Sequence, residues 1–181
     1  TAVVWRAPMM ISAFNQILGD TTWSNLDYLV VDMPPGTGDI QLSLAQSVKI
    51  SGSVIVTTPQ DVALLDARKG IEMFKKVDVP LLGIVENMSI HVCSNCGYEE
   101  SIFGSGGGDS LSLDYGTEVI GRLPLDLTIR EQTDAGYPVV ASNPDHPAAR
   151  AYVLLADKVA RRVEEVSTAA SASPKITISN D

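Results

Sequence analysis

The sequence predicts an α/β fold in which a mostly parallel sheet is covered by helices. Short, continuous runs of apolar and β-branched residues alternate with longer segments whose apolar residues recur at helical spacing. Continuous apolar runs are typical of strands that are buried on both faces, as they are in a parallel sheet. Strands that alternate with helices form right-handed βαβ units, and ligand sites in such sheets lie at the carboxyl ends of the strands.

Four short apolar runs have the character of these strands. Each ends at turn residues and precedes a helix-like segment, and together they span Tyr28–Asp32, Ser53–Thr57, Leu81–Val85 and Glu118–Arg122. The expected helices carry apolar residues three and four positions apart, which gives each helix one face for packing on the sheet. These helices are expected at Met9–Leu18, Ile40–Val48, Gln60–Val77 and Pro147–Val166.

The two ends of the chain differ in character. The sequence begins with Thr1 rather than Met, and apolar residues follow at once, so we expect it to start in the middle of a fold. Residues 167–181 are rich in Ser, Ala and Thr and show no apolar periodicity. We therefore expect one domain over residues 1–166, followed by a disordered tail at residues 167–181.

Composition and charge exclude several classes of partner. The 181 residues are 45% hydrophobic and 19% charged, as in an ordinary globular protein. The net charge is −9, from 22 acidic and 13 basic residues, and no cluster of Lys and Arg is present. We expect no nucleic-acid partner, because binding to phosphates needs a basic surface. We also expect no membrane partner, because no apolar run can cross a bilayer and the tail is not a basic amphipathic helix.

The segment from Asp32 to Asp39 joins an acidic strand end to a loop of Pro and Gly. In a nucleotide hydrolase, an acidic residue at this place holds Mg²⁺ directly or through water, and the following loop senses the terminal phosphate. Gly36 lets the backbone approach a phosphate closely. The alternative is a tight turn in which Asp32 caps the next helix. Acidic residues at both ends of the loop favour function, so Asp32, Gly36 and Asp39 are the candidate catalytic residues.

Cys93 and Cys96 are the only cysteines of the chain, and they form a C-x-x-C-G turn that ends at Gly97. Such a turn brings two thiolates onto one metal, and both zinc sites and iron–sulfur clusters mostly need four ligands. The sequence has no second cysteine pair, and its only histidines are His91 and His146. A homodimer completes the ligand set, because a two-fold axis beside the turn brings two cysteines from each subunit together.

Other uses of the cysteine pair stay open from the residues alone. A redox-active C-x-x-C usually opens a helix, which lowers the thiol pKa, whereas the residues around this pair indicate a loop. Zinc bridged between two subunits satisfies the same ligand count as a cluster. Two inert cysteines fit the close spacing least well, and a close pair in a chain without other cysteines points to a reducing compartment.

Several motifs, taken in order, resemble the Mrp (ApbC-like) family of deviant-Walker P-loop ATPases, which are implicated in iron–sulfur cluster assembly. The resemblance runs from the segment that starts at Val3 to about Val163. Besides the cysteine pair, the matching motifs are Val3-Val-Trp-Arg-Ala-Pro-Met9, Leu26-Asp-Tyr-Leu-Val-Val-Asp-Met-Pro-Pro-Gly-Thr-Gly-Asp39, Val56-Thr-Thr-Pro-Gln60, Gly83-Ile-Val-Glu-Asn-Met-Ser89, Ile102-Phe-Gly104 and Leu123-Pro-Leu-Asp126.

The resemblance implies a three-layer, P-loop NTPase-like fold with a mostly parallel sheet, lacking its N-terminal strand, P-loop and first helix. It also implies an ATP-dependent iron–sulfur cluster carrier or scaffold. In such a carrier, Cys93 and Cys96 of two subunits bridge a [4Fe–4S] cluster that is transferred to apo-proteins. ATP and Mg²⁺ are then the other cofactors, and they belong to the complete protein.

The resemblance also implies where the nucleotide base binds. Asn87 matches the position at which relatives bind adenine through a side-chain amide, which both donates and accepts hydrogen bonds. The alternative for Asn87 is an Asx turn that leaves the strand. Pro124, Leu125 and Asp126 match the loop that closes over the base.

Two departures from the family pattern matter. Ala7 stands where relatives usually have Gly in a Trp-Arg-Gly-Pro motif, so we expect a slightly different loop there. More importantly, the sequence contains no Lys-bearing phosphate loop, and its Gly-rich stretch at Gly104–Gly108 is interpreted as a flexible turn. The amides and the lysine that hold the β- and γ-phosphates are therefore missing. We expect this chain alone to hydrolyse no ATP and to be poorly stable.

Two other functions fit parts of the sequence. A partitioning-type ATPase without a cluster would need no cysteines, so the cysteine pair argues against it. A nucleotide-free, metal-binding dimer module agrees with the missing phosphate loop. Cytoplasm is the expected location because no targeting segment is visible, and a mitochondrial relative stays open because a missing N-terminal region could carry such a segment.

Overall fold

The computed structural model describes residues 7–34, 36, 38–93 and 95–172 of the chain. No helix in these ranges combines the length and the apolar character needed to cross a bilayer. The helices are α1 (Ala7–Asp20), α2 (Asp39–Ser47), α3 (Asp61–Lys76), α4 (Gly107–Tyr115), α5 (Leu127–Asp134), α6 (Val139–Ser142) and α7 (Pro147–Ala172). The strands are β1 (Ser53–Thr57), β2 (Leu81–Glu86), β3 (His91–Val92), β4 (Glu99–Glu100) and β5 (Val119–Arg122).

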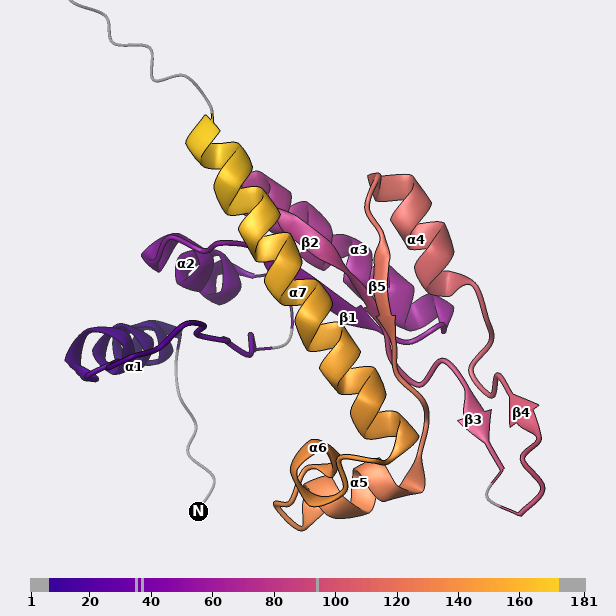
Figure 1. The fold of residues 1–181 in the computed structure, drawn as a ribbon. Coiled ribbons are helices and arrows are strands. Elements are labelled where there is room, and N and C mark those ends of the chain that lie inside the picture. Colours follow the sequence, from indigo (N-terminus) through magenta and orange to yellow (C-terminus); the bar gives the residue numbers. More distant parts are fainter. Residues whose placement is uncertain (1–6, 35, 37, 94, 173–181) are drawn as a thin grey trace, which may run out of the picture.

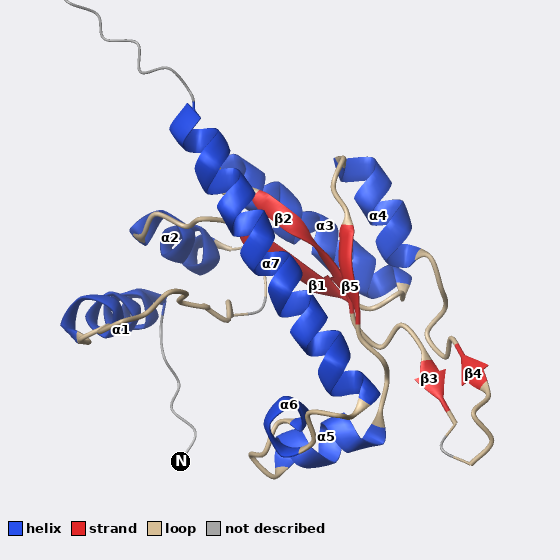
Figure 2. Ribbon diagram, in the orientation of Figure 1, coloured by secondary structure: helices blue, strands red, loops and turns tan. Residues whose placement is uncertain are grey.

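A three-stranded sheet forms the centre of the described structure. Its strands are all parallel and lie in the order β1-β2-β5. The long helix α7 crosses one face of the sheet, whereas α3 and α4 cover the other face (Figure 1). Figure 2 shows the resulting layers of helix, sheet and helix. The predicted α/β fold with a mostly parallel sheet is confirmed.

Each face of the sheet has its own apolar core. Neighbouring residues of a strand point to opposite faces, so Ile84 and Val85 of β2 contribute to different cores. On the α3 side, Ile84 packs with Ile71 and Leu111, and all three are fully buried. On the α7 side, Val85 and Ile120 pack with partly buried residues of the helix such as Tyr152 and Leu155. Each fully buried apolar side chain contributes about 1.5–3 kcal/mol to stability.

The register of the strands brings their carboxyl ends to one edge. Thr57 of β1 pairs with Glu86 of β2, and Glu86 pairs with Arg122 of β5. Backbone hydrogen bonds continue this alignment past the strands, from Asn87 N to Thr57 O at 2.7 Å and from Leu123 N to Glu86 O at 2.9 Å. The segments that follow the strands therefore lie together, as expected for a parallel sheet.

The strand predicted at Tyr28–Asp32 is wrong, because this segment lies in a loop between α1 and α2. A strand forms only where its N–H and C=O groups pair with a neighbour, and none of the described strands pairs with this segment. Its apolar side chains stay in solvent, with Val30 89% exposed. The apolar run therefore indicates the capacity to form a strand, while a neighbouring strand decides whether one forms.

The helices α1, α2 and α3 begin and end within two residues of the predicted limits. Helix α7 differs, because it continues to Ala172 where a disordered tail was expected from residue 167. Ala has the highest helix propensity, and extending an existing helix adds one hydrogen bond for each residue that is ordered. An Ala-rich end can therefore continue a helix without apolar periodicity. Residues 173–181 lie outside the described residues.

Gly83 in β2 occupies a place where no side chain fits. Its φ is +156°, and an added Cβ would lie 2.5 Å from Ile120 Cγ2 and 3.1 Å from the Glu118 carbonyl oxygen. We expect Gly83→Ala to lower the free energy of unfolding by about 2 kcal/mol or more, because β5 must shift to make room. Chemical denaturation followed by circular dichroism measures this change.

Gly19→Ala is the matched control for this substitution. Gly19 lies in α1, and an added Cβ meets nothing within 4 Å. Because Ala is a better helix former than Gly, this variant should be unchanged or more stable by up to about 1 kcal/mol. A Gly83→Ala midpoint equal to that of the wild type would contradict the close packing of β2 on β5.

Candidate functional site

The cysteine turn projects from the edge of the sheet at which the parallel strands end. The chain leaves β2 at Glu86, forms the β3–β4 hairpin, and returns through α4 to β5. In Figure 1 the hairpin lies beyond the carboxyl ends of the strands and apart from the helices that cover the sheet. The hairpin therefore reaches into solvent while its base belongs to the strand-end edge.

Glu86 closes the segment that carries the cysteines. This last residue of β2 is only 3% exposed, and its Oε2 accepts a hydrogen bond from the Gly108 N–H at 2.7 Å. Arg122 Nε at the end of β5 lies 3.6 Å from Glu86 Oε1, and Arg122 Nη2 donates to Asp109 Oδ1. A buried carboxylate needs such partners, because its loss of water is costly. The Glu86 side chain thus joins the two ends of the segment that runs from β2 to α4.

Sequence reasoning missed Glu86, although a signal was present. Glu86 directly follows the apolar run Leu81–Val85, and an acidic side chain at the end of a buried strand needs hydrogen-bond partners. The interpretation of Gly104–Gly108 as a flexible turn is also wrong at its C-terminal end, since Gly107 and Gly108 are buried and begin α4. A Cβ on Gly107 would lie 2.8 Å from the Pro59 carbonyl oxygen, so glycine is needed for this close approach.

The cysteines occupy a tight turn at the tip of the hairpin. The ladder below the turn pairs His91 with Glu100 and Val92 with Glu99. Above it, Cys93 N donates to Tyr98 O at 2.9 Å, and Gly97 N donates to Cys93 O at 2.8 Å.

Gly97 has φ of +71°, a left-handed conformation that suits glycine. Cys93 is half-buried and Cys96 is exposed, and neither forms a disulfide. The structure thus brings both predicted metal-ligating residues together in one exposed turn.

The turn stabilises the thiolate form of Cys93. Backbone N–H groups of Asn95 and Cys96 bond to the sulfur and are the main causes that hold the pKa of Cys93 below its ordinary value. The Cys96 side chain lowers this pKa further, burial raises it, and the electrostatic interaction with His91 makes the smallest contribution, which lowers it. Because the thiolate is the form that ligates metal, the turn favours ligation.

The described part of the chain supplies only half of a usual ligand set near the turn. No group of three or more His, Cys, Asp and Glu side chains there is arranged to hold a metal ion. Zinc sites and iron–sulfur clusters mostly use four protein ligands. A metal centre at Cys93 and Cys96 therefore needs two ligands from elsewhere.

Asn87 is used in a local turn at the end of β2, in agreement with the alternative considered from the sequence. Its Oδ1 accepts a hydrogen bond from the Met88 N–H at 2.9 Å. Met88 has φ of +54°, a left-handed conformation that is uncommon for a residue other than glycine, and this bond supports it. The Nδ2 group of Asn87 donates to no other described residue. The contact of Asn87 with a base stays a prediction.

The predicted base loop lies directly beside the stem of the hairpin. Leu125 N donates to Ile90 O at 2.8 Å, so Pro124 and Leu125 run alongside the chain that leads to the cysteines. Asp126 is the N-cap of α5, and its Oδ1 accepts a hydrogen bond from the Thr128 N–H at 2.7 Å. Such a cap contributes about 1 kcal/mol to helix stability. The structure thus gives Asp126 a structural role, and its role toward a nucleotide stays a prediction.

The Asp32 loop is not part of this cluster. Asp32 is exposed, Gly36 has φ of +100°, and α2 begins at Asp39. The N-cap of α2 is Gly38 and no side chain caps this end, so Asp32 is not the cap that the sequence offered as an alternative. Figure 1 shows this segment on the β1 side of the sheet, away from the hairpin. The structure therefore does not bring these residues to the cysteine turn.

Substitution of Glu86 tests the closure of the cysteine-bearing segment. We expect Glu86→Ala to lower the free energy of unfolding by about 1–3 kcal/mol, because the Gly108 N–H becomes a buried donor without an acceptor. Glu86→Gln keeps the acceptor and loses only an interaction with a half-exposed Arg122, so it should stay within about 1 kcal/mol of the wild type. Equal denaturation midpoints for the two variants would contradict this role.

The acidity of Cys93 should depend on the fold. In a Cys96→Ala variant, where the backbone donors remain, we expect alkylation of Cys93 to follow a pKa below the ordinary thiol value. In denaturant the pKa should return to that value. Because the folded thiol is the stronger acid, its ionisation stabilises the fold above the ordinary pKa, and this contribution is lost as pH falls through the lowered value. The same pKa in both states would contradict the thiolate-stabilising turn.

Comparison with known proteins shows a consistent set of relatives. Residues 1–160 match the family model described as ParA, NUBPL iron-transfer P-loop NTPase. The iron–sulfur cluster carrier protein of Pseudomonas fragi is 60% identical over 156 residues, which are 86% of this chain and 54% of that protein. The iron–sulfur cluster transfer protein NUBPL of Mus musculus is 52% identical over 162 residues, 90% of this chain and 51% of that protein. The chain thus spans about half the length of the curated relatives it matches.

Solved structures agree with the fold. A nucleotide-binding protein from Archaeoglobus fulgidus, solved in complex with ADP, has a TM-score of 0.64 at 38% identity and covers 70% of this chain and 52% of its own. The cell division ATPase MinD of Pyrococcus furiosus has a TM-score of 0.63 at 23% identity, over 88% of this chain and 63% of its own, which shows a shared fold alone. The chain belongs to the family of NUBPL iron-transfer P-loop NTPases.

Proposed function

We propose that this chain is the cluster-binding part of an ATP-dependent iron–sulfur cluster carrier. In this proposal, Cys93 and Cys96 of two copies hold one [4Fe–4S] cluster, which is cargo and passes to apo-proteins. The observation that carries the proposal is the cysteine turn, which stabilises a thiolate at an exposed tip. The names of the relatives, which are called cluster carrier and cluster transfer proteins, support it.

Two cysteine ligands from each copy, at the exposed tip of the hairpin, suit a cluster that must later be released. On transfer, each bond from iron to a cysteine of the carrier breaks and is replaced by a bond from a deprotonated thiol of the acceptor, so no electrons are exchanged. A thiol with a lowered pKa leaves more readily as a thiolate. The pKa of Cys93 therefore favours both holding the cluster and releasing it.

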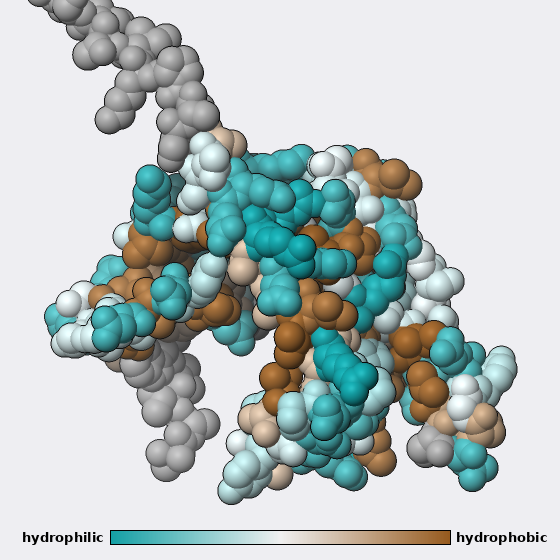
Figure 3. Space-filling view, in the orientation of Figure 1, coloured by the Kyte–Doolittle hydropathy of each residue, from teal (hydrophilic) through white to brown (hydrophobic). Residues whose placement is uncertain are grey.

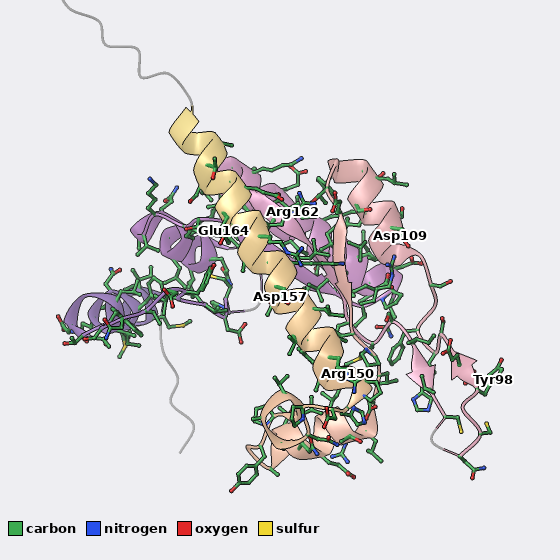
Figure 4. The ribbon with its side chains drawn as sticks, viewed as in Figure 1. Tyr98, Asp109, Arg150, Asp157, Arg162 and Glu164 are labelled. Carbon is green, nitrogen blue, oxygen red and sulfur yellow. The ribbon has the colours of Figure 1, made fainter. Side chains whose placement is uncertain are left out.

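Apolar side chains surround the turn and offer a surface for docking. Val92 is 47% exposed, Tyr98 66% and Ile102 50%. Figure 4 shows Tyr98 pointing away from the hairpin, and Figure 3 shows apolar surface where the hairpin joins the rest of the molecule. We propose that the second copy, and then the acceptor, covers these side chains during loading and transfer.

ATP with Mg²⁺ is proposed as the second ligand of the complete protein. Asn87 would hold the adenine through its Nδ2 group, beside the Pro124–Asp126 loop. Asp32 would hold Mg²⁺, and the loop from Gly36 to Asp39 would respond to the terminal phosphate. Because this sequence has no Lys-bearing phosphate loop, we propose that the chain alone hydrolyses no ATP. Cytoplasm is the proposed location.

A nucleotide-free, metal-binding dimer module is the second candidate. It is favoured by two local observations, since Asn87 Oδ1 is engaged by Met88 and the Asp126 carboxylate caps α5. Zinc could then take the place of the cluster between two copies. A partitioning-type ATPase without a cluster is the third candidate. The fold shared with MinD is compatible with it, but such a protein would have no use for the cysteine turn.

Anaerobic reconstitution with iron and sulfide tests the leading proposal. We expect one cluster for every two chains, with the visible absorbance of a [4Fe–4S] cluster and a dimer in native mass spectrometry. Cys93→Ala and Cys96→Ala should each abolish the absorbance. Ser101→Ala, which lies just past β4 and changes an exposed side chain, should retain it.

The outcomes separate the candidates. A wild-type chain that gains no cluster absorbance but binds zinc in a dimer would favour the metal-binding module. Retention of the cluster in Cys93→Ala would contradict the assigned ligands. Binding of MgATP to the reconstituted dimer, followed by calorimetry, would separate a carrier that uses nucleotide from a module that does not.

A further inference from the structure

The hairpin stem and the base loop are joined by a series of hydrogen bonds. Leu123 N donates to Glu86 O at 2.9 Å, Ser89 N to Leu123 O at 3.0 Å, and Leu125 N to Ile90 O at 2.8 Å. The last bond of the series involves a side chain, because His91 Nδ1 lies 3.0 Å from the carbonyl oxygen of Leu125. The segment that leads to the cysteines is thus held along its whole length by the segment that leads to α5.

We propose that His91 is a positioning residue that couples the cysteine turn to the Pro124–Asp126 loop. Through its bond to Leu125, loading of Cys93 and Cys96 would order this loop and the start of α5. The inference rests on the proposed function for what loads the cysteines. By linkage, a ligand that orders the loop would in turn favour the loaded turn.

The chemistry of the contact defines the state of the imidazole. A carbonyl oxygen only accepts hydrogen bonds, so the Leu125 oxygen requires a proton on His91 Nδ1. The other bonds of the series are between backbone groups and do not depend on residue type. A second side-chain bond joins the two segments at their start, since Ser89 Oγ donates to Leu123 O at 3.2 Å. His91 provides the side-chain bond nearest the cysteines, and a substitution can remove it without changing the backbone.

The position of His91 makes this bond important for the turn. His91 lies two residues before Cys93, is half-buried, and pairs with Glu100 in the hairpin ladder. The hairpin ladder has only two residue pairs, and an isolated two-stranded hairpin is at best marginally stable. The hairpin therefore depends on its contact with the Leu125 loop for order.

The other side of the bond leads to a helix. Leu125 precedes Asp126, whose carboxylate caps α5 through the Thr128 N–H. A change in the position of the Leu125 carbonyl group therefore reaches the cap of α5 within one residue. The path from the cysteines runs through His91, Leu125 and Asp126 to α5.

Three substitutions separate the hydrogen bond from the other properties of His91. His91→Asn keeps a donor, because the Asn Nδ2 takes the place of the imidazole Nδ1. His91→Phe keeps a ring of similar shape and removes the donor. Ser101→Ala is the matched control, since it alters an exposed side chain just past β4 without touching the link. His91→Gln, whose donor lies nearer the position of Nε2, replaces His91→Phe if circular dichroism shows that the Phe variant is unfolded.

Hydrogen exchange measured by mass spectrometry tests the link in the empty chain. In His91→Phe we expect amides of residues 91–100 to exchange about fivefold faster or more than in the wild type, the effect of losing one hydrogen bond. His91→Asn and Ser101→Ala should stay within about twofold of the wild type. Unchanged exchange in His91→Phe would overturn the proposal whether or not metal binds.

The same measurement after anaerobic loading with iron and sulfide tests the coupling. Loading should slow exchange of residues 123–134 in the wild type, in His91→Asn and in Ser101→Ala, but not in His91→Phe. Slowing in all four proteins would overturn the proposal. Loss of iron from His91→Phe alone would also overturn it, because His91 would then be a ligand. Failure of the wild type to load would refute the proposed function, while the empty-chain comparison still decides the link.

Discussion

The candidate site depends on the hydrogen bond between the Glu86 carboxylate and the Gly108 N–H. This bond joins the last residue of the central strand to the start of α4, and all of the cysteine-bearing segment lies between them. A carboxylate that is 3% exposed is stable only with such partners. Because this bond holds the two ends of the segment together, the conformational entropy of closing a long loop is lost at the base of the segment. The cysteine turn therefore has a fixed origin.

The site combines a rigid base with a weakly supported tip. The strand ends at Thr57, Glu86 and Arg122 belong to a sheet with apolar cores on both faces. The hairpin beyond them has a ladder of two residue pairs and depends on the Leu125 loop for further contacts. This division agrees with the proposed carrier function, in which a cluster is presented in one place and then released. The lowered pKa of Cys93 agrees with both steps of that proposal.

The parts of the site that sequence predicted are local in the chain. Cys93 and Cys96 are three positions apart, so any turn at that place brings them together, and the central strand runs are visible from their apolar residues alone. Glu86 and His91 were missed because their partners, Gly108 and Leu125, lie 22 and 34 residues away. The run Tyr28–Asp32 was misjudged for a related reason, since a strand requires a neighbour that the run itself does not specify.

The sequence by itself determined the family, the alternation of strands and helices, and the cysteine pair, because each depends on residue order or on near neighbours. Only the tertiary structure decided how these parts meet. It placed the Asp32 loop on the β1 side and the cysteine turn beyond the other strands, packed Gly108 of α4 against Glu86, and used the Asp126 carboxylate as a helix cap. The physical reason is that hydrogen bonds and close packing join groups remote in the chain, and apolar periodicity does not encode their partners.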